Sequence, residues 1–281
     1  MGEAMLIMAG LLGGERTDTA LELQYAGTEK ATGKVILLKR AAVLPTGGLP
    51  TLALKEAYFL KLLRSDYVRK LLDIVQAPDY LYLVVQDCGP SLLTLLSTQS
   101  DQVTLSFRRK VTFNLLKCLE FFQGLEIMHL ALSPRTILIG DLQRVRIEGF
   151  AAAQREGKWK ARSNAQQFSV CMSPELIAGQ APTAAADMWS VAIVLLAMVT
   201  KERLDWVGSR AEVETLMEGY LKPEEAQSIR QKLRETAPQA TPEELDLLQH
   251  LLSPNPACRP CARQALDHPY FSPEHCEATE E

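Results

Sequence analysis

This chain of 281 residues has no large excess of charge of either sign. Its formal net charge is -4 and its isoelectric point is near 5.7. The 30 lysines and arginines are scattered, and the denser basic runs are short. A protein that binds nucleic acid or an anionic membrane usually carries a strongly basic surface. We therefore expect neither nucleic acid nor a membrane among its partners.

The chain also lacks a disulfide framework and a membrane-length apolar run. Its six cysteines show no pairing pattern, and a chain of this length does not need disulfides. Cys258 and Cys261 form a C-x-x-C pair, but a zinc site would want a second pair of ligands, so no metal site is expected. The longest apolar run, residues 191–199, is about half as long as a membrane-spanning helix. We expect a reducing setting, cytoplasmic or nuclear.

The first third of the chain has the pattern of β-strands around one helix. Hydrophobic residues make up 47% of the sequence, which is enough to bury a core. Residues 21–25 alternate, residues 27–33 are rich in turn formers, and residues 35–38 form a β-type run. After Pro50, the apolar positions of residues 51–63 recur at helical spacing. Two short strands are predicted near residues 71–75 and 81–85.

After Gly89 and Pro90 the pattern becomes mostly helical. Residues 103–125 are amphipathic, residues 184–200 are apolar nearly all round, and Thr241 opens a further helix with good start signals. The fold class expected is α+β, with a small β-rich lobe that has one helix and a larger, mostly helical lobe. The predicted boundaries are residues 1–87, residues 88–275 and an acidic tail at 276–281.

Several motifs occur in the order and at the spacing that protein kinases show. Residues 129–139 (HLALSPRTILI) resemble the kinase catalytic loop H-R-D-L-K-P-x-N-I-L-I, and residues 145–151 (VRIEGFA) resemble V-K-I-x-D-F-G. Further matches to A-P-E, D-x-W-S and the terminal region lie at residues 173–175, 187–190, 259–260 and 268–271. Together they make residues 15 to 272, roughly, similar to a bilobal protein kinase domain.

Within the kinases, the chain is most similar to the cyclin-dependent group. Residues 48–56 (GLPTLALKE) resemble G-V-P-S-T-A-I-R-E, the helix that those kinases present to a cyclin. Residues 70–73 and 81–84 resemble that group's K-L-L-D and L-Y-L-V. The resemblance implies a protein partner that binds the helix at residues 50–63, and a cyclin-like protein is one candidate. Its exposed apolar anchors would be Leu52, Leu54 and Tyr58.

The resemblance also assigns structural roles to residues that match the kinase framework. Lys39 and Glu56 match the strand lysine and the helix glutamate whose ion pair marks an active arrangement. Glu175 and Arg259 match a buried ion pair of the large lobe, and Asp187 matches the aspartate that accepts hydrogen bonds from the catalytic-loop backbone. The residues that match the apolar column between the lobes are Leu60, Leu71, His129 and Phe150.

The charged residues of the same motifs are largely missing. Ala131 stands where kinases have the proton-accepting aspartate, and Gly149 stands where they have the metal-binding aspartate. The other replaced motif positions are Leu130, Ser133, Thr136 and Ala151. Residues 17–24, which align with the glycine-rich loop, contain no glycine, so side chains would hinder the approach of phosphate.

The nucleotide site is altered at the base as well. Leu37 replaces the alanine that roofs the adenine pocket, and such overpacking typically costs about 1–3 kcal/mol. A vestigial nucleotide site would thus comprise Leu37, Lys39, Glu56 and Leu138, and no cofactor is expected.

The sequence therefore predicts a protein that is not an enzyme: a catalytically inactive pseudokinase that acts as a scaffold or allosteric subunit in a complex. Two alternatives stay open. One is an unorthodox serine/threonine kinase, and the other is a metal-independent ATP-binding switch. Both would use Lys39, Glu56 and Glu148, although Glu148 should point away from the face of Gly149 if the two lie on one strand.

Overall fold

A computed structural model describes residues 6–11, 23–29, 32–44, 48–159, 168–202, 204, 207–216 and 226–272. Most of the segment aligned with the glycine-rich loop, residues 17–22, and the predicted acidic tail lie outside these residues. The chain forms two compact units, of which the first comprises Met1–Gly89 and Arg146–Ala153, and the second comprises Pro90–Val145 and Gln154–Glu281. The predicted boundary lies at residues 87 and 88, with residues 146–153 in the second lobe. The structure instead assigns Arg146–Ala153 to the first unit, because Ile147 pairs with the backbone of residues 67–69.

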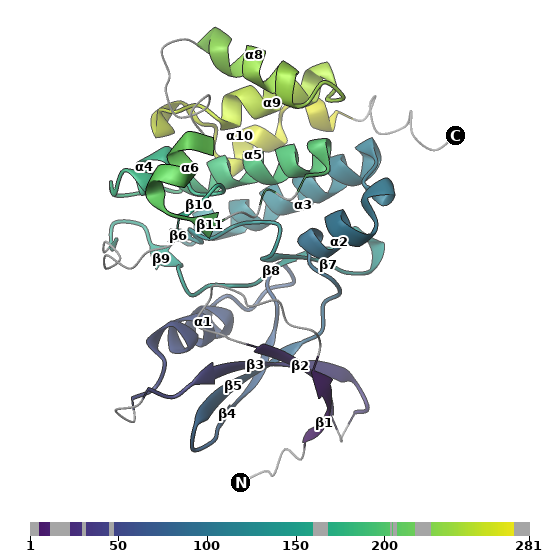
Figure 1. Ribbon diagram of the computed structural model, residues 1–281, viewed down its shortest axis with the longest axis vertical. Coiled ribbons are helices and arrows are strands. Elements are labelled where there is room, and N and C mark those ends of the chain that lie inside the picture. Colours follow the sequence, from purple (N-terminus) through teal and green to yellow (C-terminus); the bar gives the residue numbers. More distant parts are fainter. Residues whose placement is uncertain are drawn as a thin grey trace. The chain divides into compact units, whose positions relative to one another are not determined.

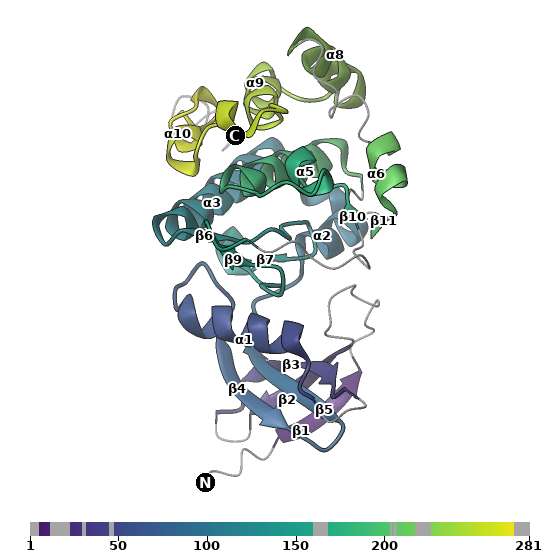
Figure 2. The ribbon, with the colours of Figure 1, turned by 90° about the vertical axis from the view of Figure 1, so that its left-hand side faces the viewer.

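The first unit is an antiparallel five-stranded sheet with one helix, α1, against it (Figures 1 and 2). The strand order is β1-β2-β3-β5-β4, so β2, β3 and β5 lie inside the sheet. The strands are β1 (Leu6–Leu11), β2 (Leu23–Glu29), β3 (Val35–Ala42), β4 (Leu71–Gln76) and β5 (Tyr80–Gln86). Ile36, Leu38 and Val84 form an apolar cluster, because alternate residues of a strand share one face.

Strand β2 is longer than the sequence indicates. Residues 27–29 were expected in a turn, but Gly27 pairs with Ile36 and Thr28 pairs with Val35. The neighbouring strand β3 supplies hydrogen-bond partners to this segment, and the ladder outweighs its turn-forming composition.

Helix α1 (Thr51–Leu62) begins directly after Pro50, as predicted. It ends where the backbone N–H of Leu63 donates to the carbonyl of Phe59 at 2.8 Å. One face is buried and includes Ala53, Glu56, Ala57, Phe59 and Leu60. The large apolar residues that remain exposed are Leu52, Leu54, Tyr58 and Leu62.

The second unit is mostly helical. Its α-helices are α2 (Leu92–Thr98), α3 (Leu105–Gly124), α4 (Pro174–Ile177), α5 (Ala185–Thr200), α6 (Arg210–Leu216), α8 (Ala226–Thr236), α9 (Pro242–Leu251) and α10 (Ala262–Leu266). Short 3-10 helices lie at η1 (Ser100–Gln102), η2 (Asp141–Gln143), η3 (Pro256–Cys258) and η4 (Pro269–Phe271). Its short strands are β6 (Ile127–Met128), β7 (Ile137–Ile139), β9 (Gln154–Arg155), β10 (Phe168–Ser169) and β11 (Val207–Gly208), while β8 (Val145–Ile147) crosses the boundary of the units.

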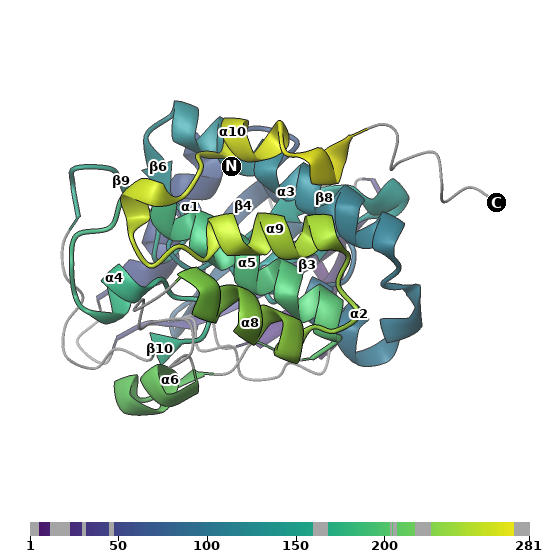
Figure 3. The ribbon, with the colours of Figure 1, turned by 90° about the horizontal axis from the view of Figure 1, so that it is seen from above.

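Helix α5 forms the centre of this unit, next to α3 and α9 (Figures 1 and 3). Every residue from Ala186 to Val199 is buried, as expected of a helix that is apolar on all sides. Among the described residues, no helix combines the length and the apolar character that crossing a membrane requires.

Local signals explain where the neighbouring helices begin. The helix predicted at residues 103–125 is slightly shorter in the structure, where α3 starts at Leu105. It starts there because the hydroxyl of Thr104 accepts from the N–H of Phe107 and caps the helix. Helix α9 starts with a capping box: the hydroxyl of Thr241 accepts from the N–H of Glu244, and the Glu244 carboxylate accepts from the N–H of Thr241. Cys258 and Cys261 do not share a helix, because η3 ends at Cys258 and α10 begins at Ala262.

Candidate functional site

Lys39 and Glu56 meet inside the first unit, as the resemblance implies. Lys39 lies on β3 and Glu56 on the buried face of α1, and Lys39 Nζ is 2.6 Å from Glu56 Oε1. The two residues are 4% and 0% exposed. A buried pair of this kind needs close contact to offset the loss of hydration, and this distance provides it.

A second carboxylate and a second cation complete this site. Glu148 Oε2 lies 3.0 Å from Lys39 Nζ and 2.5 Å from Arg69 Nη1. Arg69 also donates from Nε to the carbonyl of Gln86 at 2.8 Å. We call Lys39, Glu56, Arg69 and Glu148 the buried charge cluster. It contains two cations and two carboxylates, so it carries no net charge.

The sequence pattern did not indicate this position for Glu148. Strand alternation would turn it away from the face of Gly149, but β8 ends at Ile147 and Gly149 has φ 84°. Alternation therefore does not apply beyond Ile147. The sequence reasoning missed Arg69 altogether. The sequence hint was that Arg69 is a basic residue between the apolar Val68 and the apolar strand β4, where burial of a charge requires a partner.

The pKa shifts of Glu148 and Lys39 both favour the charged forms of these side chains. Burial would by itself raise the pKa of Glu148, but the charges of Lys39 and Arg69 lower that pKa to about 2. Burial would likewise lower the pKa of Lys39, but the carboxylates of Glu148 and Glu56 raise it above its usual value. Lys39 and Glu148 are therefore both ionised at neutral pH.

Backbone hydrogen bonds hold the segment that carries Glu148. The N–H of Arg69 donates to the carbonyl of Ile147 at 3.1 Å, and the N–H of Ile147 donates to the carbonyl of Tyr67 at 2.9 Å. Val68 and Ile147 form an isolated parallel bridge. Arg69 therefore contacts this segment twice: its backbone N–H binds Ile147, and its guanidinium binds the carboxylate of Glu148.

The remaining predicted positions of the first unit are largely packed core. Leu37 is buried on β3 opposite Val85, and Leu60 is buried on α1. The ring of Phe150 stacks on Phe59 with 6.4 Å between the ring centroids. Ala151 is buried and Leu71 is half-buried. Leu138, which was assigned to the same nucleotide site, is buried on β7 in the second unit.

In the second unit, Asp187 holds the segment that resembles the catalytic loop. Its carboxylate accepts from the N–H of His129 at 2.7 Å and from the N–H of Leu130 at 2.8 Å. Burial raises the pKa of Asp187 to about 6, although these two hydrogen bonds lower it. Leu130 has φ 59°, an uncommon value for a residue with a side chain. The two hydrogen bonds at this turn stabilise that backbone conformation.

The loop that follows is closed by its own polar atoms. Thr136 Oγ1 accepts from the N–H of Ser133 at 3.1 Å and lies 3.3 Å from the carbonyl oxygen of Ala131. The N–H of Ala131 donates to His129 Nδ1 at 3.3 Å. The Thr136 hydroxyl therefore serves the loop backbone, and the three replaced positions supply no carboxylate.

Two buried ion pairs stabilise the second unit. Arg259 Nη1 and Nη2 lie 2.7 Å and 2.8 Å from the two carboxylate oxygens of Glu175, as the resemblance implies. The second pair was not foreseen: Arg108 makes two hydrogen bonds to Glu244, at 2.7 Å and 3.0 Å. The hydroxyl of Tyr270 also donates to Glu244, at 3.1 Å. The second pair joins α3 to the start of α9.

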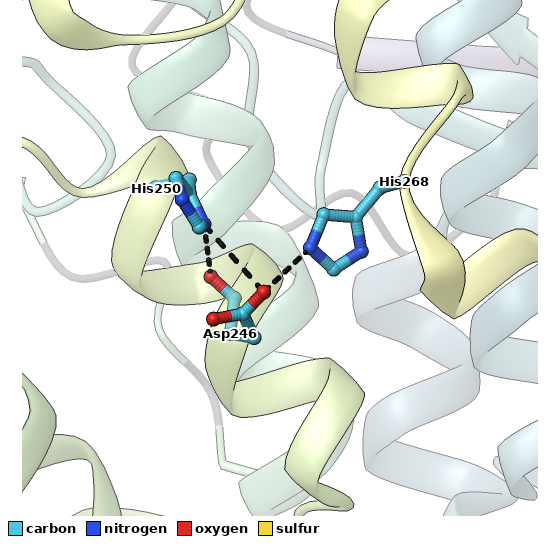
Figure 4. A group of neighbouring side chains, drawn as sticks. All are labelled: Asp246, His250 and His268. Atoms are coloured by element: carbon cyan, nitrogen blue, oxygen red, sulfur yellow. Dashed lines mark hydrogen bonds and ion pairs between the residues drawn. The ribbon is translucent and has the colours of Figure 1, made fainter.

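A cluster of Asp246, His250 and His268 has the composition of a metal site (Figure 4). The backbone N–H of Tyr270 donates to His268 Nδ1, so the ring proton of neutral His268 lies on Nε2, 3.0 Å from an Asp246 carboxylate oxygen. His250 Nδ1 lies 2.8 Å from the Asp246 carbonyl, which can only accept. A metal would need the lone pair of His268 Nε2. The geometry therefore supports a hydrogen-bonded cluster that links α9 to η4.

Comparison with known proteins identifies relatives over nearly the whole chain. The sequence model of the protein kinase domain matches residues 24–271. Serine/threonine-protein kinase ppk23 of Schizosaccharomyces pombe is 29% identical over 276 residues, which cover 88% of this chain and 68% of that protein. Cell division control protein 2 homolog 3 of Trypanosoma brucei brucei is 26% identical over 273 residues, which cover 88% of this chain and 87% of that protein.

These matches contradict the prediction that the chain is not an enzyme. The matched domain is a protein kinase domain, and one relative is named as a serine/threonine-protein kinase. The prediction rested on residue types at single motif positions, chiefly Ala131 and Gly149. Residue types at these and the other replaced motif positions do not describe a whole site, because Glu148 places a carboxylate 3.0 Å from Lys39.

Proposed function

We propose that this chain, which belongs to the protein kinase domain family, works as an allosteric subunit or scaffold of a protein complex. The observation that carries the proposal is the exposed apolar face of α1. Leu52, Leu54 and Tyr58 are 38%, 39% and 54% exposed. Leu54 and Tyr58 are one turn apart on the face opposite the buried residues, while Leu52 in the first turn lies roughly 160° from Leu54 around the helix. Clustered exposed apolar side chains are typical of protein-binding surfaces. This role is compatible with phosphoryl transfer by the same chain.

The proposed partner is a cyclin-like protein. Residues 48–56 resemble the helix that cyclin-dependent kinases present to a cyclin, and a relative at 26% identity is named as a cell division control protein 2 homologue. An apolar groove on such a partner would cover Leu52, Leu54 and Tyr58. Burial of these side chains would provide the favourable free energy of association.

The buried face of α1 gives the proposed surface an allosteric connection. Glu56 lies on that face and contacts Lys39 at 2.6 Å, while Lys55 of the same helix donates to the carbonyl of Ala152 at 3.4 Å. A partner that binds one position of α1 better than another would shift the population of that position. It would thereby change the contacts of Glu56 with Lys39.

The α1 surface is tested by the variant Tyr58→Glu. Affinity isolation of the tagged full-length chain first identifies a stable partner, and titration calorimetry then measures its binding in purified form. We expect at least a tenfold loss of affinity, because a charge would be placed in an apolar contact. The matched control is Leu142→Glu, at a 76% exposed leucine outside α1. Equal affinities of wild type and Tyr58→Glu would disprove this surface.

A second candidate function is an unorthodox serine/threonine kinase, or a metal-independent ATP-binding switch, that uses Lys39, Glu56 and Glu148. It is favoured by the name of one relative, a serine/threonine-protein kinase, and by the carboxylate of Glu148 beside Lys39. A binder of ATP should be stabilised by saturating ligand, by roughly 3 kcal/mol at a hundredfold excess over Kd.

Thermal unfolding with ATP distinguishes these alternatives. A kinase should be stabilised in the presence of Mg²⁺ or Mn²⁺ and should transfer labelled phosphate in a manner lost in Lys39→Met. A switch should be stabilised equally in EDTA. Unfolding temperatures that do not respond to ATP in either condition would rule out both forms of this second candidate.

A further inference from the structure

The pair of Lys39 and Glu56 is only half of the buried charge cluster. Lys39 Nζ is shared between Glu56 Oε1 at 2.6 Å and Glu148 Oε2 at 3.0 Å. Glu148 in turn is shared between Lys39 and Arg69. The ammonium group of Lys39 therefore already has two carboxylate partners supplied by the chain itself.

The cluster is too deeply buried for any member to lose its partners without consequence. Lys39, Glu56, Arg69 and Glu148 are 4%, 0%, 1% and 7% exposed. A charge at such depth is strongly disfavoured unless it is paired and hydrogen-bonded. Removal of Glu148 would leave two cations facing Glu56 alone.

Arg69 is the fixed point of the cluster. Its Nε donates to the carbonyl of Gln86 at the end of β5, and its N–H donates to the carbonyl of Ile147. Its Nη1 binds Glu148. Arg69 is therefore anchored to the main chain twice, once through its guanidinium and once through its own backbone N–H, and its guanidinium holds the carboxylate of Glu148 against Lys39.

Glu56 depends on Lys39 for its position. Its Oε1 is bound by Lys39, and its Oε2 has no hydrogen-bond partner within the described part of the chain. The orientation of Lys39 thus determines where the carboxylate of α1 is stabilised. Any residue that orients Lys39 also acts on α1.

We infer that Arg69 and Glu148 are positioning residues: Arg69 fixes Glu148, Glu148 fixes Lys39, and Lys39 holds α1 through Glu56. The position of α1 is therefore maintained by the chain itself, without a bound nucleotide. This inference does not depend on the partner proposed for α1.

The primary test is Glu148→Gln in the full-length protein without nucleotide. Two local readouts apply under native conditions: hydrogen exchange of α1 amides, and acylation of Lys39 by an amine-directed reagent, quantified by mass spectrometry. We expect several-fold faster exchange across Thr51–Leu62 with unchanged exchange in α5. Acylation of Lys39 should rise roughly tenfold for each unit by which its pKa falls.

The matched control is Glu120→Gln, which removes the same charge from a half-buried carboxylate that is paired with Lys117 at 2.9 Å and with Arg263 at 3.3 Å. It should leave both readouts unchanged. Wild-type exchange in α1 together with wild-type acylation of Lys39 in Glu148→Gln would overturn the inference.

A double variant separates positioning from simple charge imbalance, and it serves if Glu148→Gln alone does not fold. Arg69→Met with Glu148→Gln leaves one cation and one carboxylate, so the unfolding temperature should recover relative to each single variant. Exchange in α1 and acylation of Lys39 should nevertheless stay raised, because Lys39 has lost Glu148. Recovery of both local readouts along with the unfolding temperature would show that only charge balance matters, and would refute the positioning role.

Discussion

At the scale of single residues, Glu148 makes a pH-dependent contribution to stability. Its pKa is about 2 in the folded protein, below the ordinary value of 4.5, because Lys39 and Arg69 favour its charged form despite burial. A lowered pKa stabilises the fold above the ordinary value, and the stabilisation is lost as the pH falls towards 2. The whole contribution is roughly 3 kcal/mol.

Denaturant unfolding of wild type and Glu148→Gln across acidic pH measures this contribution. The difference in unfolding free energy should be largest above about pH 5 and should narrow as the pH approaches about 3. Asp187, whose raised pKa gives the opposite dependence, is present in both proteins and cancels in the difference. A difference that stays constant over this range would contradict the ion pairs assigned to Glu148.

Gly149 has a conformational reason for its residue type that the motif comparison does not reveal. Its φ of 84° lies in the region that favours glycine. Restoring the kinase carboxylate with Gly149→Asp should therefore cost about 1–2 kcal/mol of unfolding free energy. Gly140→Ala is the control, because Gly140 has φ -89°. Equal changes in urea unfolding for the two variants would contradict this cost.

At the scale of elements, the start of α9 unites a local signal with a distant contact. Thr241 caps the helix through Glu244, and Glu244 also binds Arg108 of α3. Thr241→Ala should lower the unfolding free energy by about 1 kcal/mol, because the backbone N–H of Glu244 loses its acceptor. Thr98→Ala removes an exposed hydroxyl that donates to the carbonyl of Thr94, rather than one that caps a helix-end N–H, and should change stability much less. A smaller effect at Thr241 than at Thr98 would argue against the cap.

At the scale of the whole molecule, the pair of Glu175 and Arg259 connects segments 84 residues apart. Both side chains are buried, so Arg259→Met would strand the carboxylate of Glu175 and should cost about 3–5 kcal/mol of unfolding free energy. The double variant Glu175→Gln with Arg259→Met should cost clearly less. Urea unfolding checks both expectations, and a double variant as unstable as the single one would contradict them.

Much of the fold could be predicted from local pattern and motif order. The α+β class, helix α1 after Pro50, the buried run of α5 and the start of α9 at Thr241 all appear where they were expected. These features depend on periodicity and capping within a few residues. The prediction of a turn at residues 27–29 was wrong, because β3 pairs with that segment. Pairing between strands is not a local property of the sequence.

The sequence by itself determined the framework: the order of the motifs, the protein kinase family and the residues that could form the pair of Lys39 and Glu56. Only the tertiary structure decided what surrounds that pair. Arg69 and Glu148 are 79 residues apart, and Arg108 and Glu244 are 136 apart. Periodicity and spacing describe neighbours along the chain, whereas a buried charge is stabilised by whichever side chain folding places within about 3 Å.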